Sequence, residues 1–278
     1  MNAAPQLRAI ERRSFVDGDE QDTRGFPFDV PTIASLKKIE IASPVMLFVG
    51  ENGSGKSTLL EALAIETSLP TVGRMAATRD KNLVQQQKLA RELRLAWSGR
   101  NHRGFFLRAE DFFGFSKQLR EQKAEAEREL ERVARDFADA TEYTRGLAMG
   151  PHRATLGAIM SRYGHDLDNQ SHGESFLALL KARLTPGGLF MMDEPEAALS
   201  PQSQLAFIAM IREAIDAGSQ FIMATHSPIL MAIPGAQIVT FDTVPPETVP
   251  FEELEHVNLT RSFLQNPERY LRHLWPTS

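Results

Sequence analysis

The sequence of 278 residues contains no cysteine, which excludes disulfides, thiolate metal ligands and cysteine nucleophiles. It also lacks any apolar run of the roughly 18 residues that a membrane span needs, and its start, MNAAPQLRAIERRSF, has no signal-peptide stretch. Basic residues do not predominate, since the formal net charge is −5, so contact with nucleic acid would need a local patch. We expect a soluble, cytoplasmic protein with no transmembrane segment of its own.

Four apolar runs, each typical of a strand buried on both faces, are the main feature of what is present. Hydrophobic residues make up 42% of the chain and charged residues 24%, which is ordinary for a globular domain. A helix with clear ends, Ser200 as N-cap, Pro201 at its first position and Gly218 past its last turn, separates two of the runs. This alternation predicts a parallel α/β sheet. The runs are VMLFVG at 45–50, LFMMDE at 189–194, FIMATH at 221–226 and QIVTFD at 237–242.

The rest of the chain predicts a single domain, 1–278, with an insertion. The N-terminal part to about residue 43 has FPFDVP and KKIEIAS, typical of short strands broken by proline and glycine. From about residue 75 to 180 the chain is helical and rich in charge, and apolar residues on one face predict a long helix in a lobe or a short antiparallel hairpin. A last amphipathic helix is expected at about 258–275, either packed on the domain or docked on a partner.

Phosphate-binding chemistry is predicted at residues 50–58, GENGSGKST, which satisfy G-x-x-x-x-G-K-[ST]. Glycines let the backbone approach an anion, the lysine reaches the β and γ phosphates, and the serine hydroxyl ligates Mg²⁺. The loop follows an apolar strand and precedes a helix, which is the context that confirms such a match. The predicted ATP-binding residues here are Gly50, Glu51, Asn52, Gly53, Ser54, Gly55, Lys56, Ser57 and Thr58.

Acidic residues and a histidine end two of the other predicted strands. Asp193 is placed to complete the Mg²⁺ site with Ser57, and Glu194 to orient or deprotonate the attacking water. His226 follows FIMAT, and its strand should end at the same carboxyl edge of the sheet. A plain turn with caps, and a structural histidine, are the alternatives.

Residues 171–174, SHGE, have two interpretations. Ser171 and Glu174 form the S-x-x-E capping box of the apolar helix that follows. The same four residues, Ser171, His172, Gly173 and Glu174, could also present a helix N-terminus to a phosphate.

The ordered set GENGSGKST, SHGES, LFMMDEPEAALS and ATHSP resembles ABC-type ATPases. Its DEPE and THSP forms are similar to the RecF-like and SMC-like branch, which includes many proteins called AAA family ATPases. The resemblance covers roughly residues 35–65 and 168–245. It implies an α/β P-loop NTPase with an ABC-type head: a mixed central sheet, an N-terminal antiparallel β subdomain and an inserted helical lobe.

The same resemblance implies the roles of individual residues. Asp193 would hold magnesium, Glu194 would be the catalytic base and His226 the γ-phosphate sensor. Ser171 and the Gly173 amide would contact, in trans, ATP bound by a second copy, so that two ATP molecules are enclosed in a head-to-tail homodimer.

Three positions depart from the family pattern. His172 replaces a second glycine of the signature, and Ser200 stands where the D-loop usually ends in aspartate. The glutamine expected before the signature is not found; GFFLRAEDFF offers Glu110, which we expect either to bind Mg²⁺ or to be an exposed acid beside Arg108. Phe26 and Phe28 are both candidates for stacking on adenine and for core packing.

The sequence therefore predicts hydrolysis of ATP to ADP and phosphate with Mg²⁺ in a dimer, but not what hydrolysis drives. Residues 88–108 hold six basic side chains and one acid, which is either a solvated face or a DNA contact. Three roles follow: an ATPase linked to DNA maintenance or defence, the ATP-binding subunit of an ABC membrane transporter, or a nucleotide-gated dimer that regulates a separate effector protein. A P-loop kinase has no use for the SHGE motif.

Overall fold

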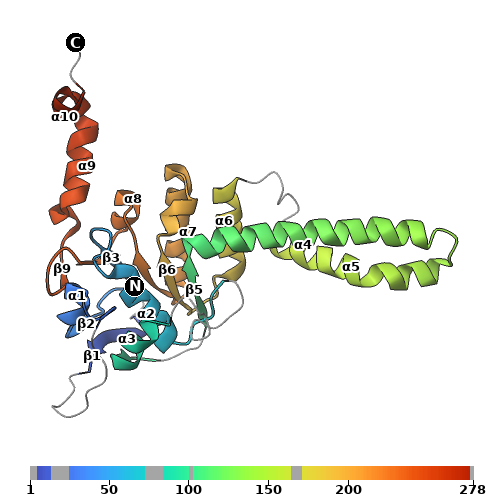
Figure 1. Cartoon of the computed structure of the whole chain (residues 1–278), viewed down its shortest axis with the longest axis horizontal. Coiled ribbons are helices and arrows are strands. Elements are labelled where there is room, and N and C mark those ends of the chain that lie inside the picture. Colours follow the sequence, from blue (N-terminus) through green and yellow to red (C-terminus); the bar gives the residue numbers. More distant parts are fainter. Residues whose placement is uncertain (1–4, 14–24, 73–83, 100–102, 164–170, 276–278) are drawn as a thin grey trace.

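A central sheet of six strands organises the computed structural model, which describes residues 5–13, 25–72, 84–99, 103–163 and 171–275 (Figure 1). Its order is β5-β6-β7-β3-β8-β9, with the first five strands parallel and β9 antiparallel to β8. The parallel arrangement brings the carboxyl ends of these five strands to one edge, where ligands bind in such sheets. The strands are β3 (Val45–Val49), β5 (Gly104–Arg108), β6 (Leu189–Asp193), β7 (Gln220–Ala224), β8 (Gln237–Thr240) and β9 (Glu247–Thr248).

Both faces of the central sheet are covered, which explains why its strands are apolar without alternation. Met46 and Phe48 of β3 join one core cluster with α2, whereas Leu47 and Val49 join the cluster on the opposite face with α6 and α7. The covering helices and short turns are α1 (Pro31–Ala34), α2 (Lys56–Glu66), α3 (Gln86–Glu92), α6 (His172–Arg183), η3 (Pro195–Ala198), α7 (Pro201–Asp216), α8 (Pro228–Met231) and η4 (Phe251–Glu253).

A second, antiparallel sheet has the order β2-β1-β4, formed by β1 (Leu7–Arg12), β2 (Lys38–Glu40) and β4 (Leu93–Trp97). Gln220 at the start of β7 joins the two sheets: its side chain accepts a hydrogen bond from the Leu7 amide at 2.9 Å and donates one to the Leu7 carbonyl at 3.0 Å. The predicted α/β class, with a mixed central sheet and an N-terminal antiparallel β subdomain, is confirmed.

The inserted helices form an antiparallel hairpin, α4 (Ala109–Asp136) and α5 (Glu142–Tyr163), which extends well away from the sheets (Figure 1). The long helix expected from the apolar spacing is α4. Of the two predicted forms of the insertion, a helical lobe or an antiparallel hairpin, the structure has the hairpin. The range 75–180 predicted for the lobe also contains strands β4 and β5. Phe112 and Leu119 of α4 and Ile159 of α5 root the hairpin in the core.

Two helices, not one, follow the last strand: α9 (Glu255–Gln265) and α10 (Pro267–Leu274). The prediction of one helix over 258–275 is wrong because Asn266 ends α9 and its side chain caps α10, accepting a hydrogen bond from the Arg269 amide at 3.2 Å, with Pro267 at the first helical position. Among the described helices, none combines the length and apolar character needed to cross a membrane.

Candidate nucleotide-binding site

The loop between β3 and α2 is curled by three glycines with positive φ: Gly50 at 138°, Gly53 at 81° and Gly55 at 102°. A Cβ on Gly50 would lie 2.8 Å from Asp242 Oδ1, and one on Gly55 would lie 2.8 Å from Thr32 Oγ1. The loop therefore needs glycine for backbone conformation and for space. It leads directly into the N-terminus of α2, where free amides and the helix dipole favour an anion.

Lys56, the first residue of α2, is buried and folds back over this loop. Its Nζ donates hydrogen bonds to the carbonyls of Gly50 and Glu51, each at 2.8 Å. Burial lowers the pKa of Lys56, and the Glu194 and Asp242 carboxylates oppose that shift. A buried ammonium at the mouth of the loop is the charge that a phosphate chain would meet.

Asp242 is a functional residue that sequence reasoning missed. Its Oδ1 accepts a hydrogen bond from the Glu51 amide at 2.7 Å, and it follows β8, the neighbour of β3. Asp242 thus fixes the first turn of the phosphate-binding loop from outside. The signal available was its place at the end of the apolar run QIVTFD, which parallels Asp193 at the end of LFMMDE.

The predicted magnesium residues Ser57 and Asp193 meet: the Ser57 hydroxyl donates to Asp193 Oδ1 at 3.0 Å. Burial, together with the charges of Glu61 and Glu194, raises the pKa of Asp193 to about 7, although the Ser57 hydrogen bond and Lys56 oppose the shift. A hydroxyl and a carboxylate are the hard oxygen donors that Mg²⁺ prefers, so the pair fits that ion. Within the described residues, no group of three or more His, Asp and Glu side chains is placed to hold a metal ion.

Glu194 and His226 come together beside this pair, as their strand positions predicted. Glu194 is in the left-handed region, with φ 49°, and its amide donates to the Ala224 carbonyl at 2.9 Å, which turns the carboxylate outward. Its Oε1 lies 3.8 Å from His226 Nε2, and both side chains are part-exposed. Burial lowers the pKa of His226, as does the Lys56 charge, so this imidazole is biased towards its neutral form.

Glu196 is a second missed residue. Its Oε1 accepts the His226 amide hydrogen at 2.5 Å, and its Oε2 is buried without a hydrogen-bond partner. Burial raises the pKa of Glu196, while the hydrogen bond from the His226 amide opposes the shift. The contact joins the turn after β6 to the turn after β7, so it fixes His226 relative to Glu194. The motif DEPE contained the residue, but spacing alone gave it no role.

The SHGE motif begins α6 as a complete capping box. The Ser171 amide donates to Glu174 Oε2 at 2.8 Å, and the Glu174 amide donates to Ser171 Oγ at 3.3 Å. Gly173 is buried against α7, where an added Cβ would lie 3.1 Å from Ser203 Oγ. Ser171 and His172 are exposed, and the His172 ring centroid is 5.8 Å from that of Phe113. The cap is therefore present, and the start of α6 exposes Ser171 and His172 to solvent, whereas Gly173 packs against α7.

Glu110 lies as an exposed acid beside Arg108, with Oε1 3.5 Å from Arg108 Nε. Asp111 holds the same guanidinium through hydrogen bonds of 2.8 and 3.0 Å. Arg108 lies opposite Asp193 in the pairing of β5 with β6, so Glu110 follows the same edge of the sheet, and its role in metal binding stays a prediction. Of the two candidates for adenine stacking, Phe28 is buried under Arg12, whose guanidinium carbon is 5.0 Å from the ring centroid, and Phe26 is exposed.

Comparisons with known proteins agree with this site. A family model described as "AAA domain" matches residues 27–67, which include the phosphate-binding loop. Another, described as "AAA domain, putative AbiEii toxin, Type IV TA system", matches residues 175–232, which include Asp193, Glu194 and His226.

Curated relatives include the macrolide export ATP-binding/permease protein MacB of Chromobacterium violaceum, 27% identical over 220 residues, and that of Salmonella typhimurium, 27% identical over 215 residues. The matches cover 75% and 76% of this chain, but the chain spans only 31% of the length of each relative.

Two solved structures are similar to this chain at low identity. One is an Smc head domain with an extended coiled coil from Pyrococcus furiosus, bound to the C-terminal domain of ScpA, with TM-score 0.43, 13% identity and coverage of 95% of this chain and 100% of that one. The other is a nucleotide-free ATP-binding cassette from an ABC transporter, with TM-score 0.43, 14% identity and coverage of 95% and 98%.

The phosphate-binding loop, the Ser57 and Asp193 pair and the parallel strand order fit an ATP-binding P-loop protein, and the two partial matches agree with that class. The chain is thus similar to AAA-domain proteins and to ABC-type ATPases.

Proposed function

We propose that this protein hydrolyses ATP to ADP and phosphate with Mg²⁺, and that it does so as a homodimer. The observation that carries the proposal is the meeting, at one sheet edge, of Ser57 with Asp193 at 3.0 Å and of Glu194 with His226 at 3.8 Å. These are the two halves of a hydrolytic phosphate site: oxygen ligands for a cation, and a base next to a group that can sense the leaving phosphate.

Each side chain then has a stated task. Lys56 exchanges its two loop carbonyls for phosphate oxygens, and the first amides of α2 bind the same anion. Bound Mg²⁺ would neutralise charge between the β and γ phosphates, held by Ser57 and Asp193. Glu194, part-exposed at the strand end, orients water and accepts its proton, and His226, biased towards neutrality, donates a hydrogen bond from one ring nitrogen.

The second copy would complete the site through SHGE. The signature helix begins beside α7 and η3, on the β5 and β6 side of the sheet, whereas the phosphate-binding loop follows β3. Ser171 and His172 are exposed at the N-terminus of α6, where they would approach ATP on another molecule, and the helix dipole favours an anion there. The capping box holds that turn in shape, so the cap and the phosphate contact are compatible.

The first test measures ATP turnover and mass in solution for the wild type and for Glu194→Gln, with and without Mg-ATP. We expect the variant to bind ATP normally, to lose at least about a hundredfold in turnover, and to form a dimer only with Mg-ATP. Lys56→Ala is the control that loses binding. A Glu194→Gln protein that stays monomeric and still hydrolyses ATP would refute both the base and the dimer.

Glu110→Gln is a matched control for the metal site, because it removes one acid from the same edge of the sheet. If Glu110 is only the exposed neighbour of Arg108, turnover and its Mg²⁺ dependence stay within about twofold of wild type. A shift of the Mg²⁺ dependence to higher concentration would assign it to the metal instead.

For the role of hydrolysis, we favour a function linked to DNA maintenance or defence. The DEPE and THSP forms and the basic stretch 88–108 support it. In the described part of that stretch, three arginines are exposed: Arg91 on α3, Arg94 on β4 and Arg103 just before β5. Arg108 is buried. Residue 100 lies outside the described residues. Binding to duplex DNA at low salt, weakened by added salt and by Arg91→Gln with Arg94→Gln, is the expected result. No binding at low salt would exclude it.

Two other roles each have a supporting observation. The MacB relatives favour the ATP-binding subunit of a membrane transporter, which predicts recovery of the protein from membranes with an integral membrane partner. The family match whose description names the AbiEii toxin favours a dimer that regulates a separate effector protein. This role predicts slow turnover of ATP by the isolated protein and a partner that binds only in the ATP state.

A further inference from the structure

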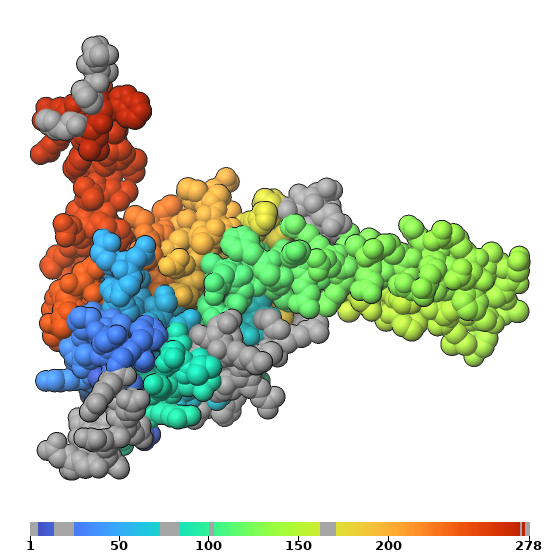
Figure 2. Space-filling model, viewed as in Figure 1, coloured from blue at the N-terminus to red at the C-terminus, as the bar shows by residue number. Residues whose placement is uncertain are grey.

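The C-terminal helices α9 and α10 form an arm that stands away from the head (Figures 1 and 2). The described residues expose twelve large apolar side chains, and five of them belong to this arm. Their exposed fractions run from 43% for Leu271 to 79% for Trp275. An apolar surface of this kind on a small projection indicates a docking surface. The five are Leu259, Leu264, Leu271, Leu274 and Trp275.

The base of the arm lies beside the ATP site. Leu254 and Val257 are buried at 4% exposure and fix the start of α9 to the core. His256 is close enough to Asp242, Glu51 and Lys56 for their charges to affect its pKa, which burial lowers. Further out, the Phe263 and Tyr270 rings pack at 5.7 Å and hold α10 on α9. The arm is therefore an ordered extension of the phosphate-binding side of the head.

The arm projects on the side of the head that carries the ATP site. α8 directly follows the carboxyl end of β7 and so marks this side in Figure 1, and the arm extends beyond it in the same direction. A second copy that faces this side would meet the arm before any other part of the head.

We propose that the arm docks on a second copy of this chain, against the base of its α4 near Phe113; this rests on the proposed ATP-dependent dimer. The strand order places β8 and β9, which lead into the arm, at one end of the central sheet and β5, which leads into α4, at the other. A head-to-tail pair brings opposite ends together, because each phosphate-binding loop faces the partner's signature helix. Phe113 is 41% exposed beside His172 of that signature helix, so it offers the arm an apolar side chain at that end of the sheet.

Because the chain has no cysteine, single cysteines test this contact directly in the Glu194→Gln background. Leu271→Cys protein is mixed with Phe113→Cys protein and treated with a short bis-maleimide, with and without Mg-ATP. We expect a cross-linked pair only with Mg-ATP. Leu147→Cys, on the hairpin and 62% exposed, replaces Phe113→Cys as the control and should give no ATP-dependent product.

The second measurement is the dimer Kd of the full chain, by sedimentation with Mg-ATP. Leu271→Asp with Leu274→Asp should weaken the dimer about tenfold and leave binding of a fluorescent ATP analogue to the monomer unchanged, whereas Leu147→Asp should change neither. A parent protein that binds ATP but stays monomeric would refute the proposed dimer itself. The arm contact alone would be overturned if the parent and the arm variant dimerised equally well and Leu271→Cys gave no cross-link to Phe113→Cys. The arm would then serve a different partner.

Discussion

At the scale of single residues, Asp193 carries the largest conflict between function and stability. Its carboxyl is buried at the end of β6 near the acids Glu61 and Glu194, and its pKa is raised to about 7 from an ordinary value of 3.8. The folded chain thus binds a proton more tightly than the unfolded chain, so the free energy of unfolding falls as pH rises from about 4 to about 7. A bound cation would offset the free-energy cost of ionising this buried carboxylate.

Asp193→Asn should therefore stabilise the nucleotide-free protein while abolishing Mg-ATP hydrolysis. At pH 8 the variant avoids an ionisation cost of roughly 2 to 4 kcal/mol, and we expect its Tm to be higher by roughly 5 °C. By pH 5 most of the wild-type carboxyl is protonated, so the difference should fall by more than half. Thermal unfolding at both pH values, without nucleotide, measures this; a variant that is less stable than wild type at pH 8 would contradict it.

Glu196 is expected to act as a positioning residue for His226, through the 2.5 Å contact with the His226 amide. Glu196→Ala removes the acceptor, so we expect the kcat for ATP to fall about tenfold while the KM changes little. Glu196→Gln keeps an acceptor oxygen and should retain most of the activity. Equal losses in the two variants, or a change mainly in KM, would show that the carboxylate has another task.

At the scale of elements, the pairing of β5 with β6 depends on Gly104. Its φ is 134°, and an added Cβ would lie 1.8 Å from the Leu189 carbonyl oxygen. Gly104→Ala should therefore cost about 3 kcal/mol or more in the free energy of unfolding. Gly114 of α4 is the matched control, because a Cβ there meets nothing within 4 Å and alanine should stabilise the helix by about 0.5 to 1 kcal/mol. Urea unfolding of both variants measures the free energy of unfolding, which should fall for Gly104→Ala and rise for Gly114→Ala.

The elements that the sequence predicted are those with a continuous physical signal. The buried strands β3, β6, β7 and β8 were readable as runs of mostly apolar residues, which are typical of a sheet whose two faces are both covered by helices. The ends of α7 were readable from Ser200 and Gly218, since the Ser200 side chain accepts the Ser203 amide hydrogen and Gly218 has φ 85°. The loop at 50–58 was readable because its glycines, lysine and serine have fixed spacing.

Contacts between distant segments were not readable in the same way. Asp242 reaches Glu51, and Glu196 reaches the His226 amide; each pair forms only after neighbouring strands end at one edge. The break between α9 and α10 was a local signal, Asn266 before Pro267, that the amphipathic pattern on both sides concealed. Glu110 was singled out by its sequence pattern alone; its carboxylate lies 3.5 Å from Arg108, which pairs with Asp193 across β5 and β6.

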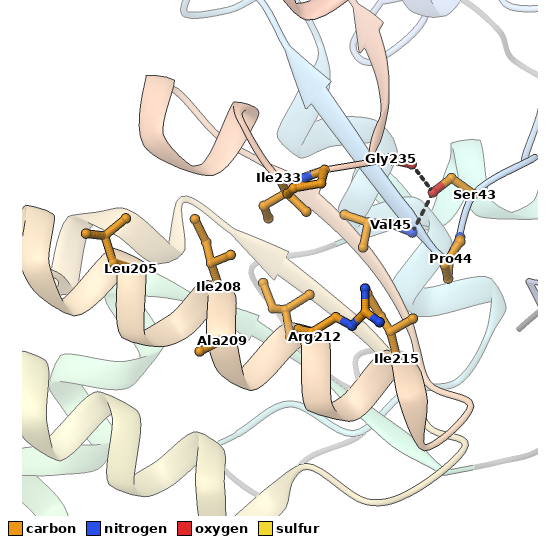
Figure 3. Close-up of a pocket in the computed structure, with 12 residues that line it drawn as sticks. Ser43, Pro44, Val45, Leu205, Ile208, Ala209, Arg212, Ile215, Ile233 and Gly235 are labelled. Atoms are coloured by element: carbon orange, nitrogen blue, oxygen red, sulfur yellow. Dashed lines mark hydrogen bonds between the residues drawn. The ribbon is translucent and has the colours of Figure 1, made fainter. Parts of the chain in front are cut away.

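At the scale of the whole molecule, two projections extend from one head (Figure 2). They are the hairpin of α4 and α5 and the arm of α9 and α10. The head also has an apolar cavity of about 430 Å³ at the opposite edge of the sheet from the phosphate-binding loop, between α7 and the start of β3 (Figure 3). Ile208 and Ile215 line one wall, and Arg212 stands at the rim, paired with Asp216 at 3.0 Å. The nucleotide site, the hairpin tip and this cavity are thus separate surfaces of the molecule.

The separation of hairpin and head predicts that most of the hairpin can be removed without loss of ATP binding. Replacing residues 124–154 by a short Gly-Ser linker would leave Phe112, Leu119 and Ile159 in the core. Ala126 and Val133, which are also buried, lie within the removed segment.

We expect the Tm of the shortened protein to stay within about 5 °C of the parent, with unchanged ATP affinity and an unchanged Mg-ATP-dependent dimer. A longer excision of 110–160, which removes Phe112 and Ile159, is the matched control and should not fold, because it opens a large gap in the core. If the shorter excision alone abolished ATP binding, the hairpin would be part of the nucleotide site, and the head could not be described as independent of it. If it left binding and dimerisation intact but removed stimulation by DNA or by a partner protein, the hairpin would be where that partner is recognised.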